Sequence, residues 1–343
     1  IDKNPEAPAA KICSRFVCGD VLGGEPRIIE ELKLADMVLP TLENDEVLEG
    51  LEKLAEEHGF IYAFDLAAYK ISSSKFMSDR LFHDHQIPSP RYYPEGEAPY
   101  IAKPDNESGS HGVTYFETEA ALKQYLLYHK GSYIVQEYLE GPSYSIEVIG
   151  KPGNYRTYEV TKIHMDEGYD CKMVTSPCDI TKEQAEAFEQ MAKKLAEILA
   201  LHGIMDLEVI DHKGEFKLLE IDARVPSQTP TAVYHTSGMN LIQELYDLFC
   251  FGEFKQEYQE EKSYAAFEHY LLVEGNLHGE GEHIMTQGGV LRYLEGAYGA
   301  EEVITDDEEG RKESRFTLIN KAKTEEELNK KREEVKACLN NLR

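Results

Sequence analysis

The feature that most constrains the fold is the segment GIMDLEVIDHKGEFKLLEIDAR at residues 203–224. Apolar and polar residues alternate along both halves, which is the period of a strand with one buried face. A three-residue loop at 212–214 is common in hairpins and would oppose Asp211 to Glu215. In that register, one face carries Asp206, Glu208, Leu218, Glu220 and Asp222, and the other carries Met205, Leu207, Val209, Leu219 and Ile221.

The acidic face of this hairpin predicts a cation site. Carboxylates on neighbouring strands repel each other, and a hard divalent cation removes that repulsion. Mg²⁺ prefers a few carboxylates together with water and substrate phosphates. Arg224, just beyond the second strand, has the fork geometry to hold a phosphate oxygen. The alternative is a solvated sheet face, but such a face usually mixes Lys, Thr and Ser with its acids.

Two upstream segments have the character of a nucleotide site. In AKPDNESGSHGV, Lys103 ends a strand and a loop with Ser108 and Ser110 follows, so that backbone N–H groups can approach phosphate oxygens. A flexible glycine loop is the alternative interpretation. In IVQEYLEG, Gln136 can bond an adenine edge, as can the backbone from Glu137 to Leu139.

Composition limits the class of protein and of partner. The chain has 343 residues, of which 41% are hydrophobic, enough for two or three folded domains. A formal charge of −28 argues against a nucleic-acid partner. No run approaches the roughly 18 apolar residues of a membrane span, so no membrane partner is expected. Six cysteines without a C-x-x-C pair indicate reduced thiols and a cytoplasmic protein. No oligomeric state follows from these patterns.

Helix signals divide the chain into alternating elements. A strand at 35–40, a helix from Asn44 or Asp45 to Gly59 and a strand at 60–65 predict a parallel α/β unit. A helix at 73–86 leads into the proline-rich linker 87–99. Further helices are expected after Thr118, from the capping pattern at Thr181 to Gly203, and after Thr324. The opening IDKNPEAPAA is typical of a strand end, so we expect a first strand and loop to precede it.

The order of these motifs resembles the ATP-grasp carboxylate–amine ligases, from residue 1 to about 240. The carrying motifs are the Lys-Pro at 103–104, the Ser/Gly loop, QEYLEG, DLEVI and LLEIDAR. The resemblance implies α/β and α+β structure: an ATP-grasp fold with an N-terminal parallel α/β (pre-ATP-grasp) domain that lacks its first strand. It divides the chain into an N-terminal α/β domain at 1–95, a small lobe at 96–150, and a large lobe at 151–343 with the metal-binding hairpin and a C-terminal helix.

The same resemblance implies ATP, two Mg²⁺ ions and a set of roles. Arg224 steadies the transferring phosphate. The nucleotide is held by Lys75, Lys103, Ser108, Ser110, Gln136, Glu137, Leu139 and Asp2, and the metals by Glu208, Glu220 and Asp222. Many members place a ribose-binding Glu where this chain has Ser143. A different ligase of this fold, such as one that joins D-alanine units, and a nucleotide-binding regulator without turnover are the alternatives.

Two longer runs narrow the resemblance to the pyrrolysine-biosynthesis ligase (PylC) family. They are EIDARVPSQTPTAVYHTSGMNLIQEL and IHMDEGYDCKMVTS. That family joins (3R)-3-methyl-D-ornithine to the ε-amine of L-lysine, so both implied partners are small diamino acids. Ammonium groups need carboxylates, and Glu43, implied to serve lysine, follows a parallel strand. The remaining candidates are Asp166, Glu167 and Asp170, together with Ser227, Gln228 and Thr229. An exposed loop is the alternative for Asp166 and Glu167. Glu268 and His269 either close the pocket or belong to the core.

Overall fold

A computed structural model describes residues 1–105, 112–129, 131–258 and 262–341. The chain forms two compact units. Unit 1 comprises Ile1–Leu66, Met165–Pro177 and Ser227–Arg343, and unit 2 comprises Ala67–His164 and Cys178–Pro226. The finer division at 95 and 150 that the sequence suggests stays a prediction. In the described part of the chain, no helix has the length and apolar character needed to cross a membrane.

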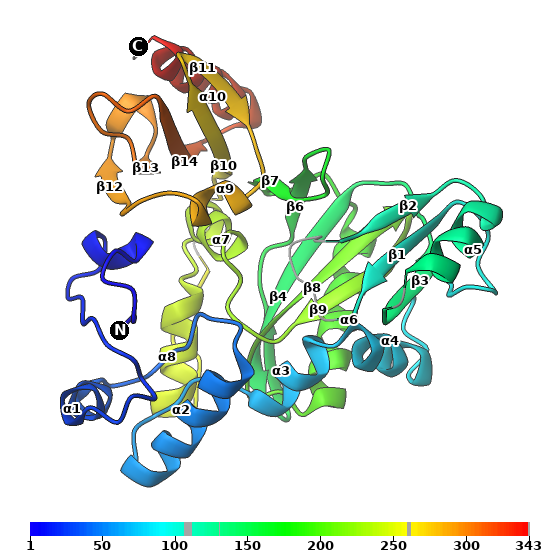
Figure 1. Ribbon diagram of the computed structural model, residues 1–343, viewed down its shortest axis with the longest axis horizontal. Coiled ribbons are helices and arrows are strands. Elements are labelled where there is room, and N and C mark those ends of the chain that lie inside the picture. The colour runs from blue at the N-terminus through cyan, green and yellow to red at the C-terminus, as the bar shows by residue number, and fades with distance from the viewer. Residues whose placement is uncertain (106–111, 130, 259–261, 342–343) are drawn as a thin grey trace. The chain divides into compact units, whose positions relative to one another are not determined.

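Unit 2 contains a small antiparallel sheet of three strands in the order β2-β1-β3. The strands are β1 (Tyr100–Pro104), β2 (Thr114–Phe116) and β3 (Tyr133–Glu137). Helix α5 (Glu119–Tyr128) begins as predicted, because the Thr118 side chain accepts a hydrogen bond from the backbone of Ala121. Leu122 of α5 packs with Tyr100, Ala102 and Phe116, which gives this small sheet its own core. Helix α5 lies beside the small sheet in Figure 1.

The larger sheet of unit 2 is built around β4 (Ser143–Lys151). It pairs antiparallel with β5 (Asn154–Thr157), β6 (Thr161–Met165) and β8 (Gly203–His212). Strand β9 (Glu215–Asp222) completes the predicted hairpin with β8. Two helices, α3 (Leu66–Ser72) and α4 (Lys75–Asp84), precede the small sheet, and Ser74 caps α4.

Helix α6 (Lys182–Leu199) covers this sheet, and its Phe188 contacts Phe216 of β9 with ring centroids 5.3 Å apart. The predicted capping box is confirmed, since Thr181 and Gln184 bond each other's backbone N–H groups. The predicted end at Gly203 is wrong. The helix ends at Leu199, where Ala200 takes a left-handed conformation and its N–H bonds back into the last turn.

The predicted register of the acidic hairpin is wrong, although its faces are largely right. Only Lys213 and Gly214 form the turn, both with positive φ, and His212 opposes Glu215. A bulge between Glu208 and Val209 then leaves β9 with one extra residue. The alternation therefore changes phase within β9. Leu218, expected beside the acids, is buried opposite Val209 instead.

The N-terminal part of unit 1 holds α1 (Pro26–Leu34) and α2 (Asp45–His58), with a 3₁₀ turn at Pro8–Lys11 before them. The limits predicted for α2 are confirmed, with Asn44 as N-cap and Gly59 as left-handed C-cap. Ile28 and Leu32 of α1 pack against Leu51 of α2. The two predicted strands are much shorter than expected, because their parallel pairing is the single bridge between Val38 and Tyr62.

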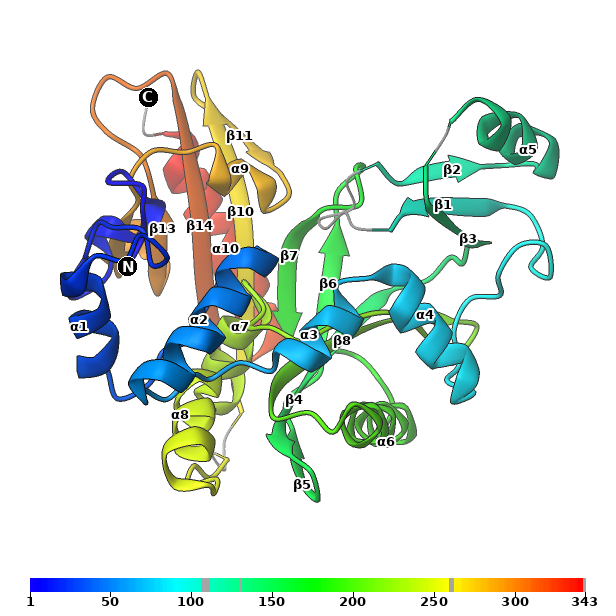
Figure 2. The ribbon, with the colours of Figure 1, turned by 60° about the horizontal axis from the view of Figure 1, so that its bottom comes forward.

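The rest of unit 1 forms a sheet in the order β12-β13-β14-β10-β7. Its strands are β7 (Cys171–Ser176), β10 (Tyr264–Val273), β12 (Arg292–Glu295), β13 (Glu302–Thr305) and β14 (Glu313–Ala322), and β11 (Asn276–Gly279) pairs with β10. Helices α7 (Thr229–Ser237), α8 (Leu241–Phe251), α9 (His283–Thr286) and α10 (Glu325–Asn340) accompany it, with a 3₁₀ turn at Ala297–Gly299. Helix α10, capped by Thr324 as predicted, lies along β10 and β14 in both ribbon views (Figures 1 and 2).

Candidate active site

The acidic hairpin places four carboxylates in two opposed pairs. Asp206 lies opposite Asp222, and Glu208 lies opposite Glu220. Asp206 is 7% exposed, and burial raises its pKa well above the ordinary value, as do the charges of Asp222 and Glu208. Arg224 opposes this rise, and its Nη2 contacts Asp222 Oδ2 at 2.7 Å. This face of the sheet therefore concentrates negative charge around one guanidinium group.

Strand β4 adds two polar groups to the same face. Glu147 lies opposite Asp206 and is fully buried, and its charge also raises the pKa of Asp206. Ser145 lies opposite Glu208, and its buried hydroxyl has no hydrogen-bond partner within the described ranges. Hard oxygen donors at this density fit a divalent cation such as Mg²⁺. The sequence prediction missed Glu147, whose only signal was an acid inside the apolar strand SYSIEVIG.

A second cluster of unit 2 surrounds Asp79 on α4, which is 7% exposed. Its Oδ2 accepts a hydrogen bond of 3.4 Å from Nε2 of the buried Gln136. Burial raises the pKa of Asp79 to about 6, while the positive charges of Lys103 and Lys75 lower it and Glu220 raises it. The structure thus brings three predicted nucleotide residues, Lys75, Lys103 and Gln136, to one buried acid. The helical pattern at 73–86 gave no sign that Asp79 points inward.

The predicted adenine hinge after β3 is anchored to the proline-rich linker. Glu137 Oε2 pairs with Arg91 Nη2 at 2.8 Å, and Glu137 Oε1 accepts from the Arg91 N–H at 2.9 Å. The backbone N–H groups of Glu137 and Tyr138 are also occupied, since they donate to the carbonyls of Arg91 and Pro99 at 2.9 and 2.7 Å. The predicted phosphate residues Ser108 and Ser110 lie outside the described residues.

In unit 1, a carboxylate that the sequence prediction did not include organises the predicted substrate residues. Glu282 Oε2 accepts hydrogen bonds from Ser227 Oγ at 2.5 Å and from Gln228 Nε2 at 2.8 Å. Gln228 is 5% exposed, and its Oε1 accepts from Cys171 Sγ at 3.2 Å. Thr229 begins α7, and its buried hydroxyl has no hydrogen-bond partner among the residues the structure describes.

Asp166 and Asp170, also predicted from sequence, lie together with His283. One ligand atom from each of the three residues lies within 4.8 Å of the others. Glu43 is exposed in the loop between Val38 and the N-cap of α2. Asp2, expected beside the nucleotide, is exposed in unit 1, where it forms a parallel bridge with Cys18. The structure therefore brings Asp166, Asp170 and His283 together. The roles of Glu43 and Asp2 stay predictions.

The sequence left the roles of Glu268 and His269 on β10 undecided, and the structure gives each of them a different environment. Glu268 is 2% exposed and makes a bidentate ion pair with Arg332 of α10, both bonds being 2.8 Å. It therefore belongs to the core of unit 1. His269 is 4% exposed, and its Nδ1 lies 2.9 Å from Thr317 Oγ1. Burial lowers the pKa of His269 to about 4, so its ring is neutral at pH 7.

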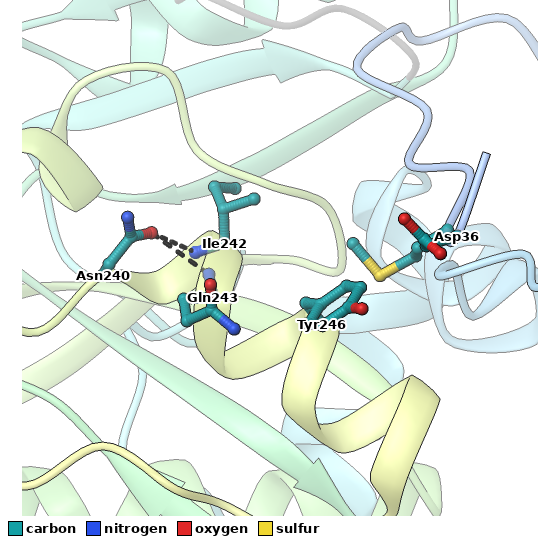
Figure 3. A pocket seen from close by; sticks show the side chains of 6 residues that line it. Asp36, Asn240, Ile242, Gln243 and Tyr246 are labelled. Atoms are coloured by element: carbon teal, nitrogen blue, oxygen red, sulfur yellow. Dashed lines mark hydrogen bonds between the residues drawn. The ribbon is translucent and has the colours of Figure 1, made fainter.

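Unit 1 also has a surface pocket of about 320 Å³ at the start of α8, which Figure 3 shows. Its lining residues are Asp36, Met37, Asn240, Ile242, Gln243 and Tyr246. Asn240 Oδ1 is occupied, since it accepts from the backbone N–H groups of Ile242 and Gln243 at 3.1 Å and caps the helix (Figure 3). None of these residues was predicted to act in the site.

The fold and the acidic hairpin define an ATP-grasp enzyme. A family model described as an ATP-grasp domain matches residues 72–228. The fold is similar to biotin carboxylase from Campylobacter jejuni, with a TM-score of 0.73 and 14% identity over 100% of this chain and 89% of that one. It is also similar to N5-carboxyaminoimidazole ribonucleotide synthetase from Thermotoga maritima, with a TM-score of 0.65 and 19% identity over 98% and 90%. The predicted ATP-grasp fold is confirmed.

Curated relatives identify the family within this class. The 3-methyl-D-ornithine–L-lysine ligase of Methanosarcina acetivorans is 38% identical over 84% of this chain and 77% of the relative. The enzyme of the same name from Methanosarcina mazei is 37% identical over 84% and 75%. The chain belongs to the family of 3-methyl-D-ornithine–L-lysine ligases, as the resemblance implied, and is an ATP-dependent ligase that forms carbon–nitrogen bonds.

Proposed function

We propose that the protein joins (3R)-3-methyl-D-ornithine to the ε-amine of L-lysine, as a cytoplasmic enzyme of pyrrolysine biosynthesis. The observation that carries this proposal is the 38% identity to a ligase of that name over 84% of the chain. The dense carboxylates in both units support it, because diamino acids are cationic and a metal-bridged nucleotide needs acidic ligands.

The reaction divides into two steps. The carboxylate of the ornithine-type acid first takes the γ-phosphoryl group of ATP, which gives an acyl phosphate and ADP. The neutral ε-amine of lysine then attacks the acyl carbon, the carbon–oxygen bond to phosphate breaks, and an amide and inorganic phosphate result. The protein orders the reactants and excludes water, which would hydrolyse the acyl phosphate.

Glu208, Glu220 and Asp222 are the proposed ligands of two Mg²⁺ ions. The opposition of Glu208 to Glu220 and the exposed position of Glu220 support this role, since the carboxylates are close and reachable. When bound, Mg²⁺ offsets the charge that gathers on the phosphoryl oxygens. Arg224, held against Asp222, donates to the transferring group.

The remaining nucleotide contacts are assigned to the cluster around Asp79 and to its neighbours. Lys75 and Lys103 hold phosphate oxygens, together with Ser108 and Ser110 of the loop. Gln136 and the backbone from Glu137 to Leu139 hold adenine. The predicted role of Asp2 in nucleotide binding is a separate proposal. Support comes from the shared electrostatic influence of both lysines on Asp79 and from the hydrogen bond of Gln136 to that residue.

The amino acids are assigned to unit 1. Ser227, Gln228 and Thr229, with Asp166 and Asp170, hold the acid that becomes phosphorylated. The buried, unsatisfied hydroxyl of Thr229 and the fixed orientation of Gln228 support this assignment. Glu43 holds the α-ammonium group of lysine, which leaves the ε-amine available for attack.

Isotope transfer tests the proposal. The full chain is incubated with ATP, Mg²⁺, L-lysine and D-ornithine labelled with ¹⁸O in its carboxylate, and phosphate and product are analysed by mass spectrometry. We expect lysine-dependent release of ADP, one ¹⁸O atom in the phosphate and an ornithyl-lysine amide on the ε-amine. Label arriving from lysine's carboxylate would reverse the two roles. Turnover with D-alanine alone would indicate another ligase, and no turnover with any pair would indicate a regulator.

A further inference from the structure

We infer that Asp166, Asp170 and His269 form the subsite for the side-chain ammonium group of the acid that becomes phosphorylated, with His283 as a positioning residue. We refer to these four residues as the ammonium subsite. The inference rests on the proposed function and deepens it. It adds His283, which the sequence did not single out, and gives His269 a specific role. The ammonium subsite determines which amino acids the enzyme accepts as the activated substrate.

The two carboxylates of the ammonium subsite are held in place by neighbouring groups. Asp166 Oδ1 accepts from the N–H groups of Gly168 at 2.7 Å and Asp170 at 3.0 Å. Asp170 Oδ2 accepts from the His283 N–H at 3.1 Å and also contacts His283 Nδ1. Gly281 packs so closely that an added Cβ would lie 2.1 Å from Asp170 Oδ2. The chain from 281 to 283 thus fixes one oxygen of Asp170 and leaves the other for a ligand.

His269 gives an independent indication of a ligand. The residue is only 4% exposed, and its Nε2 has no hydrogen-bond partner in the part of the chain that the structure describes. Buried polar atoms are normally bonded, so this nitrogen lacks a hydrogen-bond partner that a bound ligand can supply. The charged groups that act on His269 are those of Asp170 and His283.

The backbone explains why His269 lies near the other three residues of the ammonium subsite. Antiparallel pairing of β10 with β7 reaches Glu268 opposite Met173, so His269 lies near the start of β7, directly after Asp170. The N–H of Glu280 donates to the carbonyl of His269 at 3.3 Å, so the chain that leads to His283 also passes this residue. Both segments that carry the other members therefore converge on His269.

The donor set matches an alkylammonium ion. Such an ion offers three N–H donors and needs three acceptors. When Nδ1 of the neutral His269 ring donates to Thr317, Nε2 carries the lone pair and accepts. Asp166 and Asp170 supply the other two acceptors and the negative charge. A transition metal also takes carboxylate and imidazole ligands, so the metal content of the protein is part of the test below.

Hydrogen bonds connect the ammonium subsite to the residues assigned to the activated acid. Cys171 follows Asp170, and its carbonyl accepts from Gln228 Nε2 at 3.4 Å. Glu282 precedes His283 and accepts from Gln228 and Ser227. Ser227, Gln228 and the ammonium subsite therefore form one connected region of unit 1. For that reason we assign the ammonium subsite to the ornithine-type acid and not to lysine.

The test compares D-ornithine with D-2-aminopentanoic acid, which has the same chain without the side-chain amine. ADP release is measured with ATP and L-lysine for the wild type, Asp170→Asn and His283→Asn. Losing one charged hydrogen-bond acceptor should raise the KM for D-ornithine roughly tenfold to a hundredfold in Asp170→Asn. In that variant, the KM values for lysine and ATP should stay within about twofold of the wild-type values. The rate of ADP release with D-2-aminopentanoic acid should also stay within about twofold. His283→Asn, which keeps both carboxylates, should show a smaller rise in the same KM.

Glu274→Gln is the matched control, because it makes the same charge change at an exposed turn of unit 1 and should leave all constants unchanged. Unchanged preference for D-ornithine in both Asp170→Asn and His283→Asn would overturn the inference, as would a rise confined to the KM for lysine. A stoichiometric transition metal in the wild type that disappears in Asp170→Asn would make this a metal site instead. Failure of the proposed function is distinct, since the wild type would then release no ADP with D-ornithine and lysine.

Discussion

Replacing Asp79 by Asn should change how the stability of the protein depends on pH. Asp79 is 7% exposed, and burial raises its pKa from 3.8 to about 6. Lys103 and Lys75 offset part of that rise. The folded protein therefore keeps a proton on Asp79 at pH values where the unfolded chain has lost it. The asparagine side chain has a similar shape and keeps an acceptor for Gln136, but it does not titrate.

The sign and size of the effect follow from linkage. Because the folded pKa is above the unfolded value, the stabilising contribution is complete below about pH 3.8 and is lost as the pH rises to about 6. Each pKa unit corresponds to about 1.4 kcal/mol, so the whole loss is about 3 kcal/mol. Between pH 4.5 and pH 7.5, the wild type should lose about 2 kcal/mol of unfolding free energy relative to Asp79→Asn.

Urea unfolding measures this difference. Circular dichroism is the signal of choice, because the chain contains no tryptophan whose fluorescence could report unfolding. Both proteins are unfolded at several pH values between 4.5 and 7.5, without nucleotide or Mg²⁺. Asp84→Asn is the matched control on the same helix, because that side chain is 55% exposed, and it should follow the wild-type profile. Parallel profiles for the wild type and Asp79→Asn, or a wild type that gains relative stability with rising pH, would refute the reasoning.

Three further predictions concern the metals, the lysine and the core. Glu220→Gln should keep the circular dichroism spectrum but lose ligase turnover, and near-normal ADP release with saturating Mg²⁺ would contradict the metal assignment. Glu43→Ala should raise the KM for lysine much more than the KM for the ornithine-type acid, and steady-state kinetics with each substrate varied will show whether it does. Arg332→Met should lower the unfolding free energy by about 3–5 kcal/mol in a urea titration, because it leaves the buried Glu268 charge without its partner; a loss below about 1 kcal/mol would contradict that role.

Local sequence determined much of the secondary structure and the class of protein. The caps at Asn44, Thr118, Thr181 and Thr324 are recognisable because each side chain bonds a backbone N–H only three residues away. The acidic hairpin was predictable for a similar reason, since alternation reports which face is buried. The motif order also identified the ATP-grasp family, which the relatives confirm.

Tertiary structure decided what depends on distant partners. The bulge that changes the phase of β9 leaves Leu218 buried opposite Val209, and nothing in the local pattern required it. Asp79 looked like any polar helix residue until packing buried it beside Gln136. Glu282 lies 55 residues beyond Ser227, so only the folded chain brings its carboxylate to that hydroxyl. Burial and long-range contact set these environments, and a short stretch of sequence carries neither, because both are properties of the whole packed chain.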